Sequence, residues 1–199
     1  MVKAQKAAQV GTSKKTAKLN LSSPGCGRGF IYKQRKCSMQ RPTFGPAWIR
    51  FSEVNISVSQ VGALIGGKVK SNIEKGIFQN ACPIRMSYVL NYTGISIPAN
   101  SGYAAVSGKD KKWYIYRVND MIRFLEERFG KPDITERSPT PAKFSGKKGI
   151  MVILGNGWNN ARGHVTLWNG DICSDSCHFM GDPENGSFVP EVASLWILK

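Results

Sequence analysis

Cys82 is the residue in this sequence whose setting best suits nucleophilic chemistry. Pro83 follows it, and Met86, Val89 and Leu90 then recur at helical spacing. Proline at the first helical position would make Cys82 the N-cap, where free backbone N–H groups and a partial positive charge favour the thiolate. The same N–H groups can hold a developing oxyanion. Without a partner base, however, the pattern better describes a small buried side chain at a helix start.

His164 and Asp175 supply such a base and a carboxylate to orient it. The pattern predicts a strand over 163–168, a turn at Asn169-Gly170 and an antiparallel return over 171–175. In a two-residue hairpin His164 and Asp175 face each other directly, with Cβ atoms about 4.5–5.5 Å apart. The carboxylate then fixes one imidazole nitrogen, and the other can take the thiol proton. We therefore predict a Cys–His–acid hydrolase, against the alternative of a core histidine paired with a carboxylate by chance.

A second cluster, formed by Cys173, Cys177 and His178, allows two interpretations. Two cysteines and a histidine so close together can begin a zinc site, but adjacent Cys177 and His178 do not easily face one ion. A disulfide between Cys173 and Cys177 fits better, provided the chain turns between them. Four residues of extended strand span about 13 Å, whereas bridged Cα atoms lie about 4.4–6.8 Å apart.

The remaining pattern places helices before strands, which indicates an α+β fold. The segment 68–78 reads as a loop or irregular strand, and the segment 131–143 reads as a surface connection. Helices are expected from Thr43 or Gly45 through Val54, from Ser57 or Ser59 through Ile65, from Cys82 to Asn91 and from Asn119 or Asp120 to Phe129. Strands are expected over 111–118, 149–154, 163–168, 171–175 and 194–198.

Charge divides the chain into two parts. Of the 28 Lys and Arg residues, ten fall within 1–42, where there is no acidic residue. Residues 43–199 contain the other 18 basic residues and all 13 acidic residues, so the net charge of this part is +5. We expect residues 1–41 to form a basic, flexible arm and residues 42–199 to form the catalytic domain. A moderately basic domain suits a substrate rich in carboxylates.

Targeting signals are absent from the sequence pattern. No stretch approaches the roughly 20 apolar residues of a membrane span, and the N-terminal residues lack the apolar core of a secretory signal. A disulfide nevertheless implies that the protein acts in an oxidising compartment. We therefore expect a protein made in the cytoplasm without a signal peptide and active outside it.

Four segments resemble the type VI secretion amidase effectors of the fourth family. They are 78–87, 100–104, 161–170 and 188–191, and the resemblance extends over about 42–198. It implies a papain-like, NlpC-type cysteine peptidase fold in which the catalytic cysteine opens a helix packed on an antiparallel sheet. It also implies an enzyme that cleaves the bond between γ-D-glutamate and meso-diaminopimelate in the peptidoglycan of rival bacteria, and a cognate immunity protein that protects the producer.

By position, the resemblance implies that Cys82 is the nucleophile, His164 the base and Asp175 the orienting acid. Cys173 and Cys177 match the disulfide positions of the family. Arg85 is a candidate for binding a substrate carboxylate, with a solvated salt bridge as the alternative. The other candidates for the substrate groove are Ser101, Gly102, Tyr103, Trp158 and Gly163.

The expected mechanism is amide hydrolysis by acyl transfer, with no cofactor. The backbone N–H of Cys82 is the expected oxyanion donor. The expected partners are the peptidoglycan peptide, an immunity protein and the type VI secretion machinery, with delivery to the periplasm of the target cell. Two alternatives predict different behaviour: an intracellular Cys–His isopeptidase or acyltransferase would have no disulfide, and a nucleic-acid-binding protein would use the basic arm in a salt-sensitive way.

Overall fold

The computed structural model describes residues 40–99, 101–158, 162–179 and 187–199. Among these, the predicted basic arm is represented only by its last two residues, and the rest of the arm lies outside the described part. Arg41 is bonded to the folded domain: its guanidinium pairs with Asp133 and donates to the carbonyl oxygens of Ile197, at 2.9 Å, and Phe129, at 3.2 Å. Residues 40–41 therefore belong structurally with the residues that follow them.

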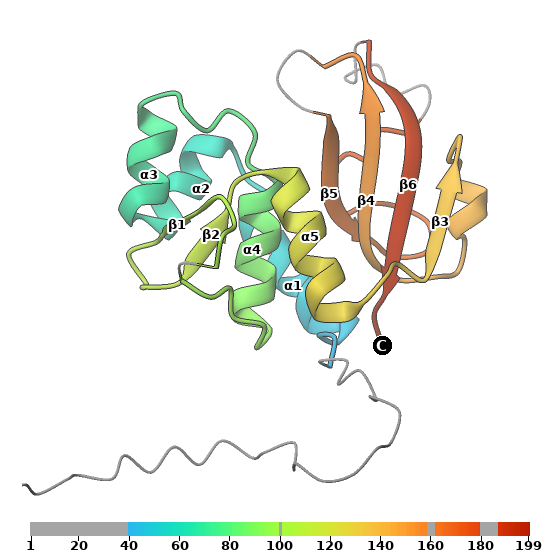
Figure 1. The fold of residues 1–199 in the computed structure, drawn as a ribbon, viewed down its shortest axis with the longest axis horizontal. Helices are drawn as coiled ribbons and strands as arrows, with labels where there is room; N and C mark the ends of the chain where they lie inside the picture. The colour runs from blue at the N-terminus through green and yellow to red at the C-terminus, as the bar shows by residue number, and fades with distance from the viewer. Residues whose placement is uncertain (1–39, 100, 159–161, 180–186) are drawn as a thin grey trace, which may run out of the picture. The chain divides into compact units, whose positions relative to one another are not determined.

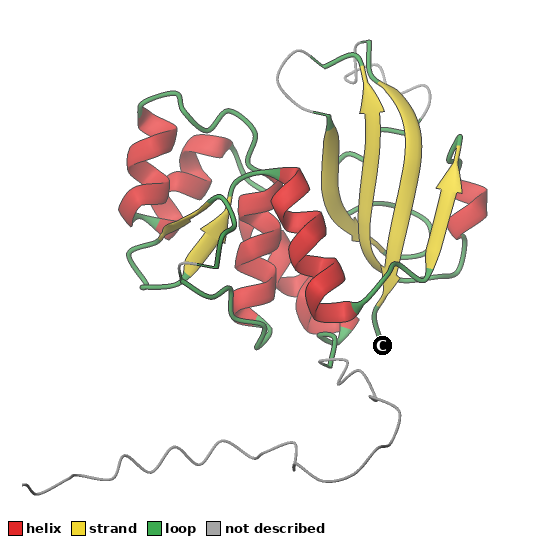
Figure 2. Cartoon of the chain, viewed as in Figure 1, coloured by secondary structure: helices red, strands yellow, loops and turns green. Residues whose placement is uncertain are grey.

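The α-helices lie between residues 44 and 129 (Figures 1 and 2). Helix α2 (Val58–Ile65) begins with a full capping box, in which Ser57 and Gln60 satisfy each other's backbone N–H groups. Helix α5 (Val118–Phe129) has Gly130 as its C-cap, and the positive φ of 79° at that position suits glycine. The helices are α1 (Phe44–Val54), α2 (Val58–Ile65), α3 (Gly67–Glu74), α4 (Cys82–Tyr92) and α5 (Val118–Phe129), with a 3-10 turn, η1, at Pro141–Phe144.

Two antiparallel sheets complete the fold. The small sheet pairs β1 (Ala105–Ser107) with β2 (Trp113–Ile115), and the larger one has the strand order β3-β6-β4-β5. Its strands are β3 (Ile134–Arg137), β4 (Gly149–Asn156), β5 (Gly163–Trp168) and β6 (Val189–Ile197). The helices and the four-stranded sheet lie side by side in Figure 1, where β5 is the strand nearest to them.

The central strand β4 has a core on each face, which explains its unbroken apolar sequence. Ile150 and Val152 join the cluster formed with α1, α4 and α5, whereas Met151 and Ile153 join the cluster on the opposite face. The first cluster also contains Cys82, so the start of α4 is fixed against the same core that holds the sheet.

The predicted α+β fold is confirmed, as are all four predicted helices. Two connections were predicted wrongly: residues 68–78 contain α3, and residues 131–143 contain β3. The predicted return strand 171–175 is also wrong, because only an isolated bridge between Trp168 and Cys173 forms there.

Candidate active site

The start of α4 places Cys82 as the sequence predicts, but one position later in the helix. Ala81 is the N-cap and its carbonyl accepts from the N–H of Arg85 at 2.8 Å, so Cys82 is the first helical residue. The backbone N–H of Cys82 donates to Oδ1 of Asn80 at 3.1 Å. Cys82 is fully buried and is a free thiol. A thiol, a helix N-terminus and a side-chain carboxamide therefore meet at one point.

His164 is the second residue of β5, and the glycine before it lets that strand lie close to β4. A Cβ atom on Gly163 would lie 2.6 Å from Cδ2 of Leu154 and 2.7 Å from the carbonyl oxygen of Ile153. Gly163 is buried. The structure thus gives Gly163 a packing role next to His164.

His164 and Asp175 are paired, although not in the predicted register. Nε2 of His164 lies 3.0 Å from Oδ1 of Asp175. The turn spans four residues, because Asn169 N–H donates to the carbonyl oxygen of Ile172 at 3.0 Å and Trp168 pairs with Cys173. This shifts the partner strand by two residues. A shift of two keeps every side chain on its original face, so the predicted contact survives the wrong register.

A disulfide joins Cys173 and Cys177, with their Cα atoms 5.2 Å apart. The sulfur atoms are bonded to each other, so neither is available as a thiolate ligand and the zinc interpretation is wrong. The bridge closes a tight loop with Asp175 at its centre. It therefore limits the positions that the carboxylate can take beside His164.

The electrostatics of the site favour a charged imidazolium. Burial lowers the pKa of His164, but the negative charge of Asp175 and contact with Cys82, including hydrogen bonds to both, raise that pKa to about 10. Burial alone would raise the pKa of Asp175. The effect of burial is outweighed by His164, Thr166 and Arg85, which together lower that pKa. Since Nε2 is engaged by Asp175, Nδ1 is the nitrogen left for the sulfur.

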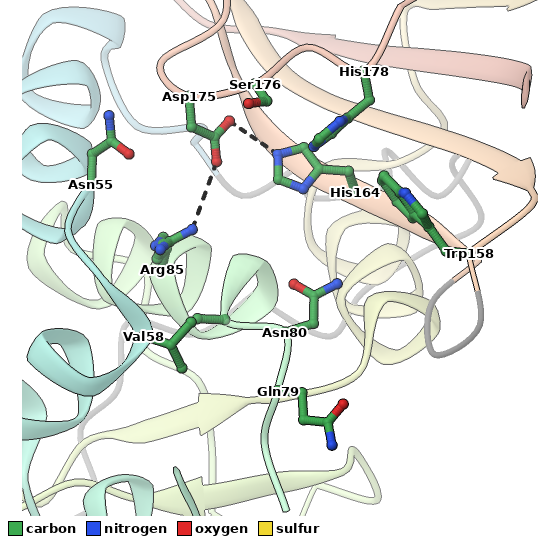
Figure 3. A pocket seen from close by; sticks show the side chains of 11 residues that line it. Asn55, Val58, Gln79, Asn80, Arg85, Trp158, His164, Asp175, Ser176 and His178 are labelled. Carbon is green, nitrogen blue, oxygen red and sulfur yellow. Dashed lines mark hydrogen bonds and ion pairs between the residues drawn. The ribbon is translucent and has the colours of Figure 1, made fainter. Parts of the chain in front are cut away.

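Cys82, His164 and Asp175 lie beside a pocket of 430 Å³, which we call the catalytic pocket (Figure 3). His164 and Asp175 line it, and so do Asn80 and Ala81, the two residues before Cys82. Figure 3 shows Asp175 between His164 on one side and Arg85 on the other.

Comparison with known proteins decides the family. Residues 78–192, more than half of the chain, match the family model of Tae4, the type VI secretion system amidase effector protein 4. The chain belongs to the Tae4 family. The resemblance read from the sequence is thereby confirmed, and with it the assignment of the chain as an amidase effector enzyme of the type VI secretion system.

Solved Tae4 structures agree with this assignment. The chain is 64% identical to Tae4 in a Tae4–Tai4 effector–immunity complex from Enterobacter cloacae, with a TM-score of 0.78, covering 80% of this chain and all of that one. It is 63% identical to Salmonella typhimurium Tae4 bound to Tai4 from Enterobacter cloacae, with the same TM-score and coverage. Enterobacter cloacae Tae4 alone is 62% identical, with a TM-score of 0.76, covering 81% and 99%. No curated protein matches the chain.

In this Tae4 family member Arg85 contacts Asp175. Its Nη1 lies 4.0 Å from Oδ2 of Asp175, and its Nη2 donates to the carbonyl oxygen of Ile56 at 2.6 Å. The side chain lines the catalytic pocket and is 16% exposed. Arg85 thus joins the connection between α1 and α2 to the acid, which is nearer to the salt-bridge alternative than to the predicted free carboxylate ligand.

Trp158 lines the catalytic pocket as predicted and belongs to a chain of aromatic rings. It stacks on Phe188 at 3.8 Å between centroids and meets His178 edge to face at 4.8 Å. His178 in turn lies edge to face with His164 at 4.6 Å. The sequence suggested His178 only as a zinc ligand. Its place beside His164 depends on how the chain leaves the loop closed by the disulfide, which no local pattern specifies.

Ser101, Gly102 and Tyr103 do not line the catalytic pocket. Tyr103 packs edge to face on Phe124 at 5.6 Å between centroids, and the Gly102 carbonyl accepts from Arg123 at 2.6 Å. Ser101 bonds within its own loop, to the Pro98 carbonyl at 2.9 Å. Their observed contacts are with α5 and with the loop that precedes β1.

No helix in the described part of this Tae4 family member is long and apolar enough to cross a membrane. The predicted basic arm of residues 1–41 lies, apart from its last two residues, outside the described ranges.

Proposed function

We propose that this effector hydrolyses the bond between γ-D-glutamate and meso-diaminopimelate in peptidoglycan peptides, with Cys82 as nucleophile, His164 as base and Asp175 as orienting acid. The observation that carries the proposal is the convergence of a helix-terminal thiol, a buried imidazole and a carboxylate beside one pocket. Family membership supplies the class of substrate. This arrangement matches the logic of nucleophile, base and orienter in acyl transfer.

The reaction begins with attack of the Cys82 sulfur on the γ-glutamyl carbonyl carbon. The Cys82 thiol passes its proton to His164, and the raised pKa of His164 keeps that proton on the imidazole at neutral pH. The C–N bond then breaks as His164 gives its proton to the leaving amine of diaminopimelate. In the second half His164 takes a proton from water, which hydrolyses the thioester and frees Cys82.

The oxyanion needs a hydrogen-bond donor, and we expect the Cys82 N–H to fill this role. In the structure this N–H already donates to a side-chain oxygen. That oxygen is Oδ1 of Asn80, a residue that lines the catalytic pocket. A carbonyl oxygen of the substrate can take the same position when the Asn80 side chain turns away. In the protein without substrate, the Asn80 carboxamide oxygen would thus occupy the position that the substrate oxyanion takes at the start of α4.

The same family suggests a partner for this chain, and the disulfide suggests its place of action. The related Tae4 proteins were crystallised with Tai4 immunity proteins, and we propose that an immunity protein of this kind also binds this chain. We propose the periplasm of a target bacterium as the place of action, because the Cys173–Cys177 disulfide suits an oxidising compartment. The same disulfide argues against the intracellular isopeptidase alternative. We retain the division into a basic N-terminal arm and an amidase domain over 42–199, with Arg41, which is bonded to the domain, at the boundary between them.

Digestion of Gram-negative sacculi, with mass spectrometry of the released fragments, tests the function. We expect wild type to release fragments that end in γ-D-glutamate and fragments that begin with diaminopimelate. Cys82→Ala should fold with an unchanged melting curve and release neither. Release by Cys82→Ala at the wild-type rate would overturn the mechanism, and cleavage at a different bond would overturn the proposed specificity.

A further inference from the structure

A second pocket lies along the segment that leads into α4. Its volume is 540 Å³, within the range of ligand-binding clefts. Gln79 and Asn80 line both this pocket and the catalytic pocket. The two hollows therefore adjoin along residues 79–80, just before the proposed nucleophile. We call the second one the Arg117 pocket, after the cation in its wall.

The Arg117 pocket combines an aromatic surface with one positive charge. Phe78 and Tyr116 stack at 4.5 Å between centroids and form part of its lining. Ile77, also in the lining, is 62% exposed. The guanidinium carbon of Arg117 lies 5.7 Å from the centre of the Tyr116 ring. Within the described ranges, Arg117 forms no ion pair with a carboxylate, so its charge remains available.

The chemistry of the proposed substrate matches this lining. A γ-linked glutamate leaves its α-carboxylate free, and diaminopimelate carries further carboxyl groups. The neighbouring alanines offer methyl groups. A single exposed guanidinium next to an aromatic and aliphatic surface fits one carboxylate with an apolar group beside it.

The distances along the chain suit a peptide stem that extends from the catalytic pocket. Gln79 precedes Cys82 by three residues, so the two lie at most about 11 Å apart. Each residue of an extended peptide covers about 3.5 Å. A stem of two or three residues beyond the cleaved bond would thus pass residues 79–80 and enter the Arg117 pocket.

We propose that the Arg117 pocket is a second substrate subsite, in which Arg117 binds a carboxylate of the peptidoglycan stem while the stem packs against Tyr116 and Ile77. This inference rests on the proposed function. It assigns substrate affinity to a pocket that contains neither His164 nor Asp175. The reacting groups and the affinity-determining groups are then separable by mutation.

The first test compares steady-state kinetics of Arg117→Ala, Arg117→Lys and Arg117→Glu on a soluble tetrapeptide muropeptide. We expect the KM of Arg117→Ala to rise about tenfold with kcat within twofold, because a charge-assisted contact is lost from binding alone. Arg117→Lys should recover part of the affinity, and Arg117→Glu should be worse than Arg117→Ala. Arg137→Ala is the matched control, since Arg137 is exposed on β3, at the sheet edge opposite β5.

The second test identifies the carboxylate. Binding of muropeptides is measured by calorimetry with Cys82→Ala protein, with and without Arg117→Ala, using the free peptide and peptides amidated at the D-glutamate or at the diaminopimelate carboxyl group. Amidation of the partner carboxylate should cancel the effect of Arg117→Ala, and amidation of the other should not. Arg117→Lys or Arg117→Glu can take the place of Arg117→Ala in this comparison, so it remains decisive if one of the Arg117 variants folds poorly.

The outcomes separate this inference from the proposed function. If wild type and Arg137→Ala cleave muropeptides and Arg117→Ala does so with an unchanged KM, the subsite is overturned and the function stands. If Arg117→Ala loses affinity for a Tai4 immunity protein but keeps its KM, the pocket is a partner surface and the subsite is again overturned. If wild type cleaves no muropeptide, the proposed function itself fails.

Discussion

Thr166 and His164 bind the same oxygen atom of Asp175. The hydroxyl of Thr166 donates to Oδ1 of Asp175 at 2.6 Å, and Nε2 of His164 lies 3.0 Å from that oxygen. The Ser174 hydroxyl lies 3.0 Å from the Thr166 hydroxyl and accepts from the N–H of Leu167 at 3.2 Å. A chain of hydrogen bonds therefore runs from the backbone of β5 through two hydroxyls to the carboxylate. Thr166 is fully buried, so water does not replace it.

Removal of the Thr166 hydroxyl should weaken catalysis through Asp175. Thr166→Val keeps the shape of the side chain but leaves Oδ1 with one donor fewer, and we expect kcat to fall about tenfold with KM nearly unchanged. Thr166→Ser should retain most of the activity, because it keeps the donor. Thr135→Val on the exposed face of β3 is the matched control and should behave as wild type. Equal kcat values for Thr166→Val and wild type would show that this hydroxyl does not position the acid.

Asp175→Asn should narrow the pH range of activity from the alkaline side. In wild type the charge of Asp175 holds the pKa of His164 at about 10, against the effect of burial. Asparagine removes that charge and leaves the burial, so the pKa of His164 should fall by about 1–3 units. The alkaline limb of kcat/KM should move down with it. Profiles recorded between pH 5 and 11 would check this, and superimposable alkaline limbs would contradict it.

The ionisation of His164 and Asp175 also makes the stability of the folded protein depend on pH. The raised pKa of His164 adds stability that is complete below about pH 6.5 and is lost as the pH rises toward about 10. The lowered pKa of Asp175 adds stability that is present above about pH 4 and is lost on acidification. The difference in unfolding free energy between wild type and Asp175→Asn should therefore be greatest between about pH 4 and 6.5. Urea denaturation at a series of pH values measures it.

The chemistry-bearing residues could be predicted from the sequence because each has a local signature. Pro83 and the stripe of Met86, Val89 and Leu90 mark the start and the buried face of α4. The strand pattern over 163–168 matches β5 to the residue. The predicted pairing of His164 with Asp175 succeeded because an error of two residues in register preserves the face.

The features that were missed lack such signatures. Gly66-Gly67 reads as a helix stop, yet Gly66 serves both as the C-cap of α2 and as the N-cap of α3. Helix α3 buries only Val69 among its residues, so its apolar period is weak. Strand β3 is a short edge strand that exists because β6 lies beside it. The proposed roles of Asn80 and Arg117 depend on pockets, which tertiary packing creates.

Loss of the disulfide should affect both activity and stability. A Cys173→Ala/Cys177→Ala variant frees the loop that carries Asp175, and closing a loop of this length is worth about 2 kcal/mol in the unfolded chain. We expect the unfolding free energy to fall by about that amount and kcat to fall with it. Treatment of wild type with dithiothreitol should reproduce both changes, and the double variant should not respond to dithiothreitol. A fully active double variant would show that the bridge does not position Asp175.

Substitutions of Asn80 should separate its hydrogen bond with the first N–H group of α4 from its place at the oxyanion position. In Asn80→Ala the Cys82 N–H loses its partner, so we expect a loss of stability of about 1 kcal/mol, while the N–H stays open to the substrate. In Asn80→Asp a carboxylate caps the helix as well as asparagine does, so the melting temperature should not fall. That fixed charge competes with the oxyanion for the same N–H group, and we expect kcat to fall by about 10²-fold or more. Asn80→Asp should therefore be the more stable and the less active of the two variants. The reverse order of activity would show that the side chain at position 80 does not compete with the oxyanion for the Cys82 N–H.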